Sequence, residues 1–171
     1  MSLARVRALV VLGALVVLAA VAAGWAIAKD TETAARLATP CVKSTVPFSA
    51  AIPARPSDVR VNVYNATSEM GLANTVAEEL RVRRFTVAQV GNDPLQESVE
   101  APVQIRYGPR GAGAAQMLRA WFPGAEPRLM PRADAQVDLV LGMRYEGFTT
   151  AADYTVERNR LGEPTKPPEL C

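Results

Sequence analysis

An uninterrupted apolar segment near the amino terminus constrains the fold of this chain more than any other feature. From Ala8 to Ala28 the sequence has 21 consecutive residues without a charged side chain. As a helix this segment is about 31 Å long, which matches the thickness of the hydrocarbon core of a bilayer. Residues 1–28 are therefore predicted to form a transmembrane anchor.

The charges that flank this segment predict its orientation. Arg5 and Arg7 precede it, whereas only Lys29 follows it closely, so the amino terminus is expected in the cytoplasm. Cleavage as a signal peptide is an alternative, because Ala26-Ile27-Ala28 has the small-x-small pattern of a cleavage site. In both cases we expect the part beyond residue 28 to be extracytoplasmic, and the anchored form to be a single-pass protein of the cell membrane.

Composition excludes several classes of function. The 171 residues include no histidine and two cysteines, which excludes Ser-His-Asp or Cys-His catalysis, histidine metal sites and a zinc ribbon. Arg5 and Arg7 belong to the anchor, so the 19 basic residues reduce to 17 outside it, against 17 acidic residues. Such a balance does not favour nucleic acid. We predict no metal, no cofactor and no nucleic-acid partner.

The two cysteines, Cys41 and Cys171, are predicted to form a disulfide, because extracytoplasmic compartments are oxidising. The bridge closes a loop of about 131 residues and stabilises the fold by up to about 5 kcal/mol in the loop-entropy model. Two alternatives stay open: an intermolecular disulfide, and lipidation of Cys41. The preceding Ala38-Thr39-Pro40 is a poor match to a lipoprotein signal.

Prolines predict an extended chain on both sides of the folded part. Proline fixes φ and lacks an amide donor, so it disfavours long helices and central strands. Residues 29–57, with Pro40, Pro47, Pro53 and Pro56, are predicted to form a stalk. Residues 149–171, with Pro164, Pro167 and Pro168, are predicted to form an extended tail that runs back towards Cys41.

The order of the predicted elements indicates the fold class. Alternating apolar and polar residues predict strands, and apolar residues four apart, such as Leu72, Val76 and Leu80, predict a helix. The expected strands are residues 59–64, 85–90, 103–107, 128–130 and 137–141, and the expected helices end near Arg83 and Phe122. Residues 58–148 are therefore predicted to form an α/β domain of the α+β class. It is a two-layer β-α-β-β-α-β(β) sandwich with both helices on one face of the sheet.

Four short motifs occur in an order that is typical of one family. They are Val61-Asn62-Val63-Tyr64-Asn65-Ala66-Thr67, Gly71-Leu72-Ala73, Phe85-Thr86-Val87 and the closing strand Val137 to Gly142. In this order they resemble the LytR C-terminal domain of actinobacterial envelope proteins, over about residues 58–143. The chain departs from the pattern at Arg84, where the family often has glycine, so the resemblance leaves the end of the first helix open.

The resemblance implies a role at the cell wall. In many relatives this domain follows a LytR-CpsA-Psr catalytic domain, which transfers glycopolymers to peptidoglycan and which needs roughly a hundred residues or more. Here only residues 29–57 separate the apolar segment from the domain. The resemblance therefore implies a module that is not an enzyme and that supports cell envelope integrity through contacts with envelope proteins or the cell wall.

Strand alternation predicts a candidate ligand-binding face on the side of the sheet without helices. The residues expected there are Arg60, Asn62, Tyr64, Gln104 and Arg106. Tyr64 is suited to stacking on a sugar ring, and the two arginines are suited to carboxylate or phosphate oxygens. A peptidoglycan- or glycopolymer-binding module is therefore the alternative function. The same pattern also fits the solvated side of an antiparallel sheet.

Other patterns carry weaker signals. Asp134 with Asp138, and Glu97 with Glu100, are carboxylate pairs of the kind that acid–base catalysis uses, but solvated charges explain them better. Asn65-Ala66-Thr67 matches an N-glycosylation acceptor, a short pattern that often occurs by chance.

The disulfide prediction is tested by intact mass spectrometry of the full chain after thiol alkylation without a reductant. We expect the mass of a monomer with no alkylated cysteine. Two alkylated cysteines would contradict the bridge, and a disulfide-linked dimer would replace it with the intermolecular alternative.

Overall fold

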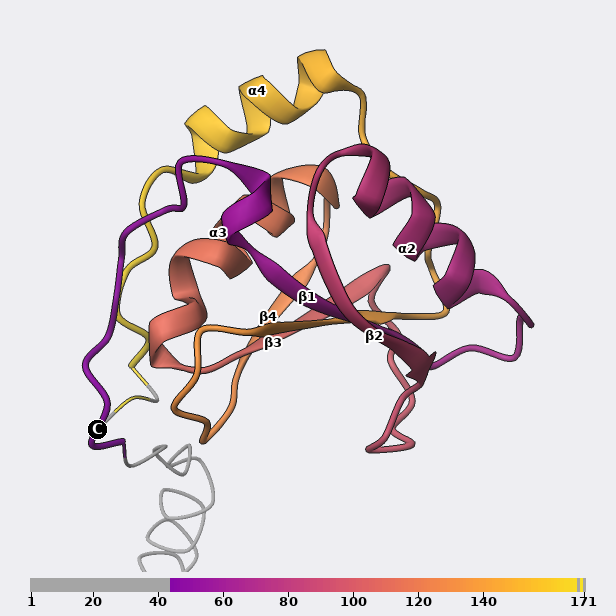
Figure 1. Cartoon of the computed structure of the whole chain (residues 1–171), viewed down its shortest axis with the longest axis horizontal. Helices are drawn as coiled ribbons and strands as arrows, with labels where there is room; N and C mark the ends of the chain where they lie inside the picture. The colour runs from indigo at the N-terminus through magenta and orange to yellow at the C-terminus, as the bar shows by residue number, and fades with distance from the viewer. Residues whose placement is uncertain (1–43, 169, 171) are drawn as a thin grey trace, which may run out of the picture. The chain divides into compact units, whose positions relative to one another are not determined.

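A mixed five-stranded sheet with the strand order β2-β1-β5-β3-β4 is the framework of the structure. A computed structural model describes residues 44–168 and 170 of the chain (Figure 1). The strands are β1 Arg60–Asn65, β2 Thr86–Asn92, β3 Val103–Tyr107, β4 Glu126–Leu129 and β5 Val137–Leu141. β1 runs parallel to both β2 and β5, whereas β3 is antiparallel to β5 and parallel to β4.

Two helices, α2 Leu72–Val82 and α3 Ala112–Trp121, cover one face of this sheet (Figure 1). A third helix, α4 Ala151–Leu161, lies over α3 on the side away from the sheet. Short 3-10 turns, η1 Pro56–Asp58 and η2 Pro109–Gly111, precede β1 and α3. The predicted α+β sandwich with two helices on one face is confirmed.

The core lies between the sheet and the two covering helices. Val61 and Val63 alternate with polar residues along β1 and are fully buried. On α2 the apolar stripe that predicted the helix is the buried face, and its Val76 and Leu80 join the same cluster. Leu118 joins it from α3. The period of the sequence pattern therefore determines which face of each element is buried.

The turn that ends α2 forms although arginine occupies the position where the family often has glycine. Arg84 has a φ of 68°, in the left-handed region. The turn is closed by two backbone hydrogen bonds, from Phe85 N to Leu80 O at 2.9 Å and from Arg84 N to Arg81 O at 2.8 Å. A residue with a β-carbon in this conformation costs about 1–2 kcal/mol, so the turn carries strain that glycine would not.

The prediction of an extended tail from residue 149 is wrong for residues 151–161, which form α4. Thr150 caps this helix by accepting a hydrogen bond from Asp153 N at 3.1 Å. Tyr154 stacks on Trp121 of α3, with ring centroids 4.2 Å apart. The prolines that favour an extended chain begin only at Pro164, so they do not oppose a helix upstream.

The described part of the predicted stalk, residues 44–57, is extended apart from η1 but packs on the domain. Phe48 and Ile52 contact the core, and Ser49 N donates a hydrogen bond to Pro109 O at 3.0 Å. Ala51 O comes so close to Gly113 of α3 that a β-carbon there would lie 1.9 Å away. Glycine at this position therefore permits the contact.

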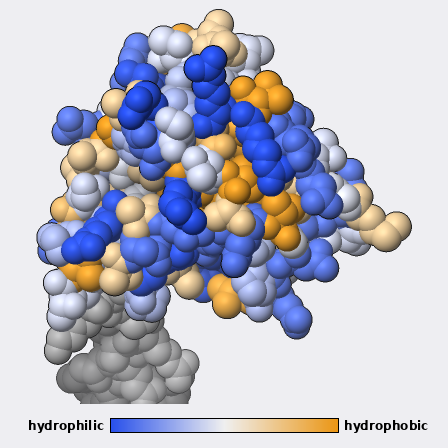
Figure 2. Space-filling view, in the orientation of Figure 1, coloured by the Kyte–Doolittle hydropathy of each residue, from blue (hydrophilic) through white to orange (hydrophobic). Residues whose placement is uncertain are grey.

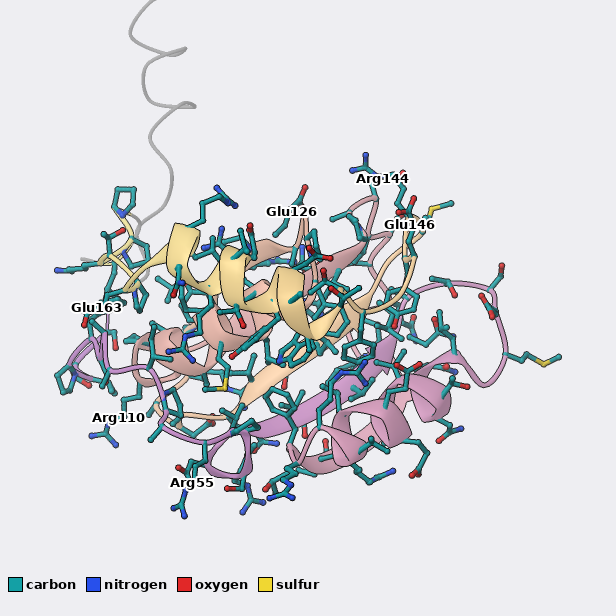
Figure 3. All side chains as sticks on the ribbon, turned by 90° about the horizontal axis from the view of Figure 1, so that it is seen from above. Arg55, Arg110, Glu126, Arg144, Glu146 and Glu163 are labelled. Atoms are coloured by element: carbon teal, nitrogen blue, oxygen red, sulfur yellow. The ribbon has the colours of Figure 1, made fainter. Side chains whose placement is uncertain are left out.

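Both ends of the described chain lie at the same end of the domain. Residues 162–168 run beside residues 44–50 in two perpendicular views (Figures 1 and 3). The predicted transmembrane segment, Cys41 and Cys171 lie outside the described residues, so the anchor and the disulfide stay predictions. Among residues 44–168 and 170, no helix has the length and apolar character needed to cross a membrane.

Replacing Arg84 with glycine is expected to stabilise the protein. The substitution relieves the left-handed strain at the end of α2 but increases the entropy of the unfolded chain, so the net gain is about 0.5–1 kcal/mol. Urea unfolding of the full chain in detergent measures it. Arg84→Ala is the control, because it removes the guanidinium and keeps the strain. Equal changes for both variants would contradict the assignment to backbone strain.

Candidate functional site

The face of the sheet opposite α2 and α3 brings four of the five predicted site residues together around β5. Pairing between β1, β5 and β3 sets Asn62, Asp138 and Arg106 in one row, and Tyr64, Val140 and Gln104 in the next. Arg60 lies at the start of β1, on the rim of this surface, with an exposed side chain. Strand pairing therefore places Asn62, Tyr64, Gln104 and Arg106 on one face, with Arg60 at its rim.

This face is not open, because the residues between β2 and β3 fold over it. Val99 and Ala101 of this segment pack against Val140 of β5, and Tyr64 of β1 contacts the same small apolar cluster. Beneath the segment Arg106 is only 1% exposed. The prediction that Arg106 is available to a ligand is therefore wrong. The two apolar residues drive the closure, because they are buried only when the segment covers the sheet.

Arg106 forms a bidentate ion pair with Asp93, the first residue after β2. Its two terminal nitrogens lie 2.6 and 3.0 Å from the carboxylate oxygens, and both side chains are 2% exposed. Arg106 Nε donates to Gln104 Oε1 at 2.7 Å, and Nη2 lies 3.3 Å from Glu97 Oε2. Glu97 also pairs with Arg128 of β4. The guanidinium predicted to bind an anionic ligand binds carboxylates of its own chain.

A second network of polar side chains joins β1 to the loop before β5. Asn62 Nδ2 donates to Asp138 Oδ1 at 2.7 Å, and Gln136 Nε2 donates to Asn62 Oδ1 at 2.5 Å. Arg132 lies 2.9 Å from Asp138 and 3.0 Å from Asp134. Both carboxylates of this possible catalytic pair are therefore held by one arginine, which favours a structural role.

The pKa of Asp93 lies below its usual range, and the ion pair explains why. Burial by itself raises this pKa, but the hydrogen bond from Arg106, the amides of Leu95 and Glu97 and the charge of Arg106 together lower it. The carboxylate therefore stays ionised in the folded protein at neutral pH. Its amide contacts also shape the covering segment, since Leu95 N and Glu97 N lie 3.3 and 3.4 Å from its oxygens.

Of the predicted site residues on β1, Arg60 is exposed and Tyr64 is half-buried. The Tyr64 hydroxyl donates to Gln89 Oε1 of β2 at 2.8 Å. Burial, followed by the nearby Asp138 carboxylate, raises its pKa. Arg60 has no ion-pair partner in the described part of the chain. Arg106 is buried beneath the covering segment whereas Arg60 is exposed on the rim, so the predicted joint recognition of an anionic glycan is not supported.

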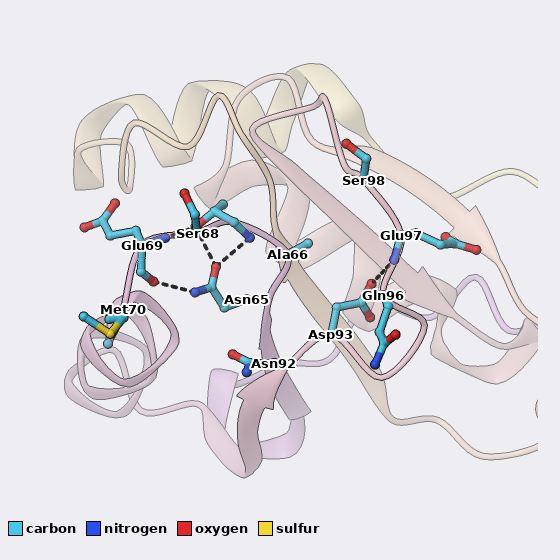
Figure 4. A pocket seen from close by; sticks show the side chains of 12 residues that line it. Asn65, Ala66, Ser68, Glu69, Met70, Asn92, Asp93, Gln96, Glu97 and Ser98 are labelled. Carbon is cyan, nitrogen blue, oxygen red and sulfur yellow. Dashed lines mark hydrogen bonds between the residues drawn. The ribbon is translucent and has the colours of Figure 1, made fainter.

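A groove lies at the edge where the parallel strands β1, β2 and β5 end (Figure 4). Loops after the carboxyl ends of parallel strands are frequent ligand sites. The groove has a volume of about 680 Å³ and is lined by residues 65–71 and by Asn92, Asp93 and 96–98. Asn92 and Gln96 are exposed there, and their amide groups have no partner among the described residues.

Asn65 builds one wall of this groove. Its Oδ1 accepts hydrogen bonds from Thr67 N at 2.9 Å and from Thr67 Oγ1 at 2.8 Å, and its Nδ2 donates to Glu69 O at 2.6 Å. The side chain is thus committed to a turn, and the residue is only 8% exposed. The acceptor pattern Asn65-Ala66-Thr67 is explained by this turn, not by glycosylation.

Comparison with known proteins identifies the family. Residues 58–145, which span β1 to the end of β5 and the residues just after it, match the family described as LytR cell envelope-related transcriptional attenuator, the LytR C-terminal domain family. The chain belongs to this family. The match confirms the resemblance carried by the sequence motifs and ends before α4, which lies outside the LytR C-terminal match.

Two relatives share this domain. The cell envelope integrity protein Cei of Mycobacterium tuberculosis is 36% identical over 102 residues, which are 58% of this chain and 46% of Cei. The chain therefore spans about half the length of this relative. The crystal structure of the soluble domain of a conserved hypothetical secreted protein from Mycobacterium marinum has a TM-score of 0.57 and 31% identity, covering 68% of this chain and 81% of that one.

Sequence reasoning missed the partners of Arg106. The pattern Gly91-Asn92-Asp93-Pro94 predicts only a turn, Glu97 is expected among solvated charges, and Arg128 is expected to begin a short strand. None of these expectations indicates a contact with Arg106, because the residues between β2 and β3 show no regular period. One signal was present: Val99 and Ala101 are apolar and two residues apart, which is typical of a segment with one buried side.

Removing the Asp93 charge is expected to destabilise the protein strongly. Asp93→Asn leaves the buried Arg106 with a weaker partner, at a cost of roughly 3 kcal/mol at pH 7. Because the folded-state pKa of Asp93 is lowered, its contribution is complete above the pKa of the unfolded chain, about 4, and is lost as the pH falls through the folded value. In urea unfolding, the difference between wild type and Asp93→Asn should therefore narrow on acidification to about pH 2.5. A difference that is the same at both pH values would contradict this role.

Proposed function

We propose that this protein is a membrane-anchored extracytoplasmic module that supports the integrity of the cell envelope through contacts, and that it is not an enzyme. The observation that carries the proposal is the 36% identity to a protein named for cell envelope integrity, over 102 residues. The second relative is a secreted protein, which supports an extracytoplasmic location.

The geometry of the sheet supports contact over catalysis. The charged side chains on the covered face, Arg106, Asp93, Asp138 and Arg132, are all engaged with one another or with neighbouring residues of the fold. Groups that stabilise the fold in this way are poor candidates for proton transfer, because catalysis needs a group that can change its protonation state near neutral pH.

The positions of the chain ends support the predicted disulfide and its place in this function. Residues 44–50 and 162–168 lie side by side (Figure 1). Cys41 and Cys171 are each three residues along the sequence from these segments. A bridge there would fasten the tail to the stalk just outside the membrane.

Deletion of the gene in its native host tests the proposal. We expect increased release of cytoplasmic protein and increased lysis by detergent, both restored by the full chain. A chain cut after residue 57, expressed at the same level, should fail to restore them, because it lacks the domain. Normal resistance of the deletion strain would contradict a role in envelope integrity.

Two matched variants separate contact from catalysis. Glu100 and Glu146 carry exposed carboxylates, and neither forms an ion pair in the described residues. Glu100→Gln and Glu146→Gln should each restore the deletion strain as well as the wild type does. Loss of restoration by either variant, at normal protein level, would favour an enzyme.

Sedimentation with insoluble cell wall tests the alternative, a peptidoglycan- or glycopolymer-binding module. The groove with free Asn92 and Gln96 amides is the observation that favours it. The full chain in detergent is mixed with purified wall and centrifuged. Retention that Asn92→Ala with Gln96→Ala abolishes would favour glycan binding at the groove, whereas no retention at any ionic strength would favour protein contacts.

A further inference from the structure

The two edges of the sheet differ in how they are protected from pairing with another strand. The β4 edge is only four residues long and contains Pro127 between Glu126 and Arg128. Short length, proline and charge all prevent association at an edge. The β2 edge is seven residues long, Thr-Val-Ala-Gln-Val-Gly-Asn, without proline or charge. Within the described residues β2 pairs with β1 alone, so its outer side is available.

On the face of the domain seen in Figure 2, the surface over α2 and β2 is more apolar than the rest. In Figure 2 the hydrophobic side chains of this view gather mainly over the half that holds α2 and β2. Val82, the last residue of α2, is 80% exposed. Exposed apolar side chains beside an unprotected edge strand favour burial against another chain.

A bulge interrupts β2 near its start and leaves most of the strand regular. Val61 pairs with Val87 and Asn62 with Gln89, so Ala88 has no partner on β1. Bulges can protect an edge by twisting it. The four residues Gln89–Asn92 that follow stay in register with β1. They provide a straight segment for pairing.

Charges at the two ends of β2 indicate which strand fits. Near its amino end, Arg84 and Arg60 are exposed and have no ion-pair partner in the part of the chain that the structure describes. At its carboxyl end, the exposed Glu69 lines the groove together with Asn92, and its carboxylate is equally unpaired there (Figure 4). An antiparallel second copy therefore brings Arg84 towards Glu69 of its partner at both ends, whereas a parallel copy brings like charges together.

We propose that β2 is a dimer interface, through which two copies of this chain pair antiparallel about a twofold axis near the middle of the strand. Main-chain hydrogen bonds between the two β2 strands join the two sheets into one, with the helices of both copies on the same face. A twofold arrangement uses one self-complementary surface twice, which fits an uncharged strand with opposite charges at its ends.

The middle of the strand provides the first test. Gln89 is exposed and lies close to the proposed axis. In the full chain in detergent, Gln89→Lys and Gln89→Glu each place like charges against each other and should weaken the dimer several-fold. An equimolar mixture of the two variants should restore it as a heterodimer. Light scattering after gel filtration measures the mass, and Thr155→Lys and Thr155→Glu on the exposed side of α4 are the matched controls.

The charges at the strand ends test the direction of pairing. Arg84→Glu and Glu69→Arg should each weaken the dimer, and the double variant should restore it, with thermal unfolding used to confirm that each variant is folded.

Three results would overturn the proposal: a wild-type chain that stays monomeric, a dimer that the Gln89 variants leave unchanged, and Gln89 variants whose mixture fails to associate. A dimer that the Gln89 variants leave unchanged would point to pairing elsewhere in the chain, including the apolar segment. A wild-type chain that stays monomeric would point to a strand from another protein as the partner of β2.

Discussion

The ion pair between Arg106 and Asp93 determines what kind of surface this domain presents. Burying a guanidinium and a carboxylate is costly, and a buried pair often adds little net stability compared with apolar residues. Its effect here is on conformation. Asp93 follows β2 and Arg106 lies on β3, with the two strands β1 and β5 between them, so their pairing fixes the path of the chain between β2 and β3 over the sheet. Val99 and Ala101 then fill the space beside Val140.

Closure of this face leaves the groove at one end of the domain and the edge of β2 as its accessible features. The strands β1, β2 and β5 run in one direction, so the loops that follow them gather at one end, where the groove lies. The described chain ends lie at the opposite end (Figure 1). The proposed anchor before the domain would leave the groove and the β2 edge accessible to other molecules, which fits the proposed module that acts by contact.

The sequence predicted the elements well because each has a periodic pattern, and it predicted the site poorly because the site depends on a segment without one. The valines of β1 and the four-residue spacing on α2 determine the core. The same alternation placed Asn62, Tyr64, Gln104 and Arg106 on one face. Whether that face meets water depends on residues 93–102, whose position is determined by contacts distant in sequence. Helix α4 is not predicted by the sequence, because the prolines that follow it favour an extended chain and its Thr150 cap is a signal of one residue only.

Amide hydrogen exchange of the full chain tests the closed face most directly. Leu95 N and Glu97 N donate to the buried Asp93 carboxylate, and Met143 N donates to Val99 O at 2.8 Å. If the segment is held on the sheet, these three amides exchange far more slowly than those of an unstructured peptide, and Asp93→Asn speeds the exchange of Leu95 and Glu97. Exchange at the unprotected rate in the wild-type chain would contradict the closed face.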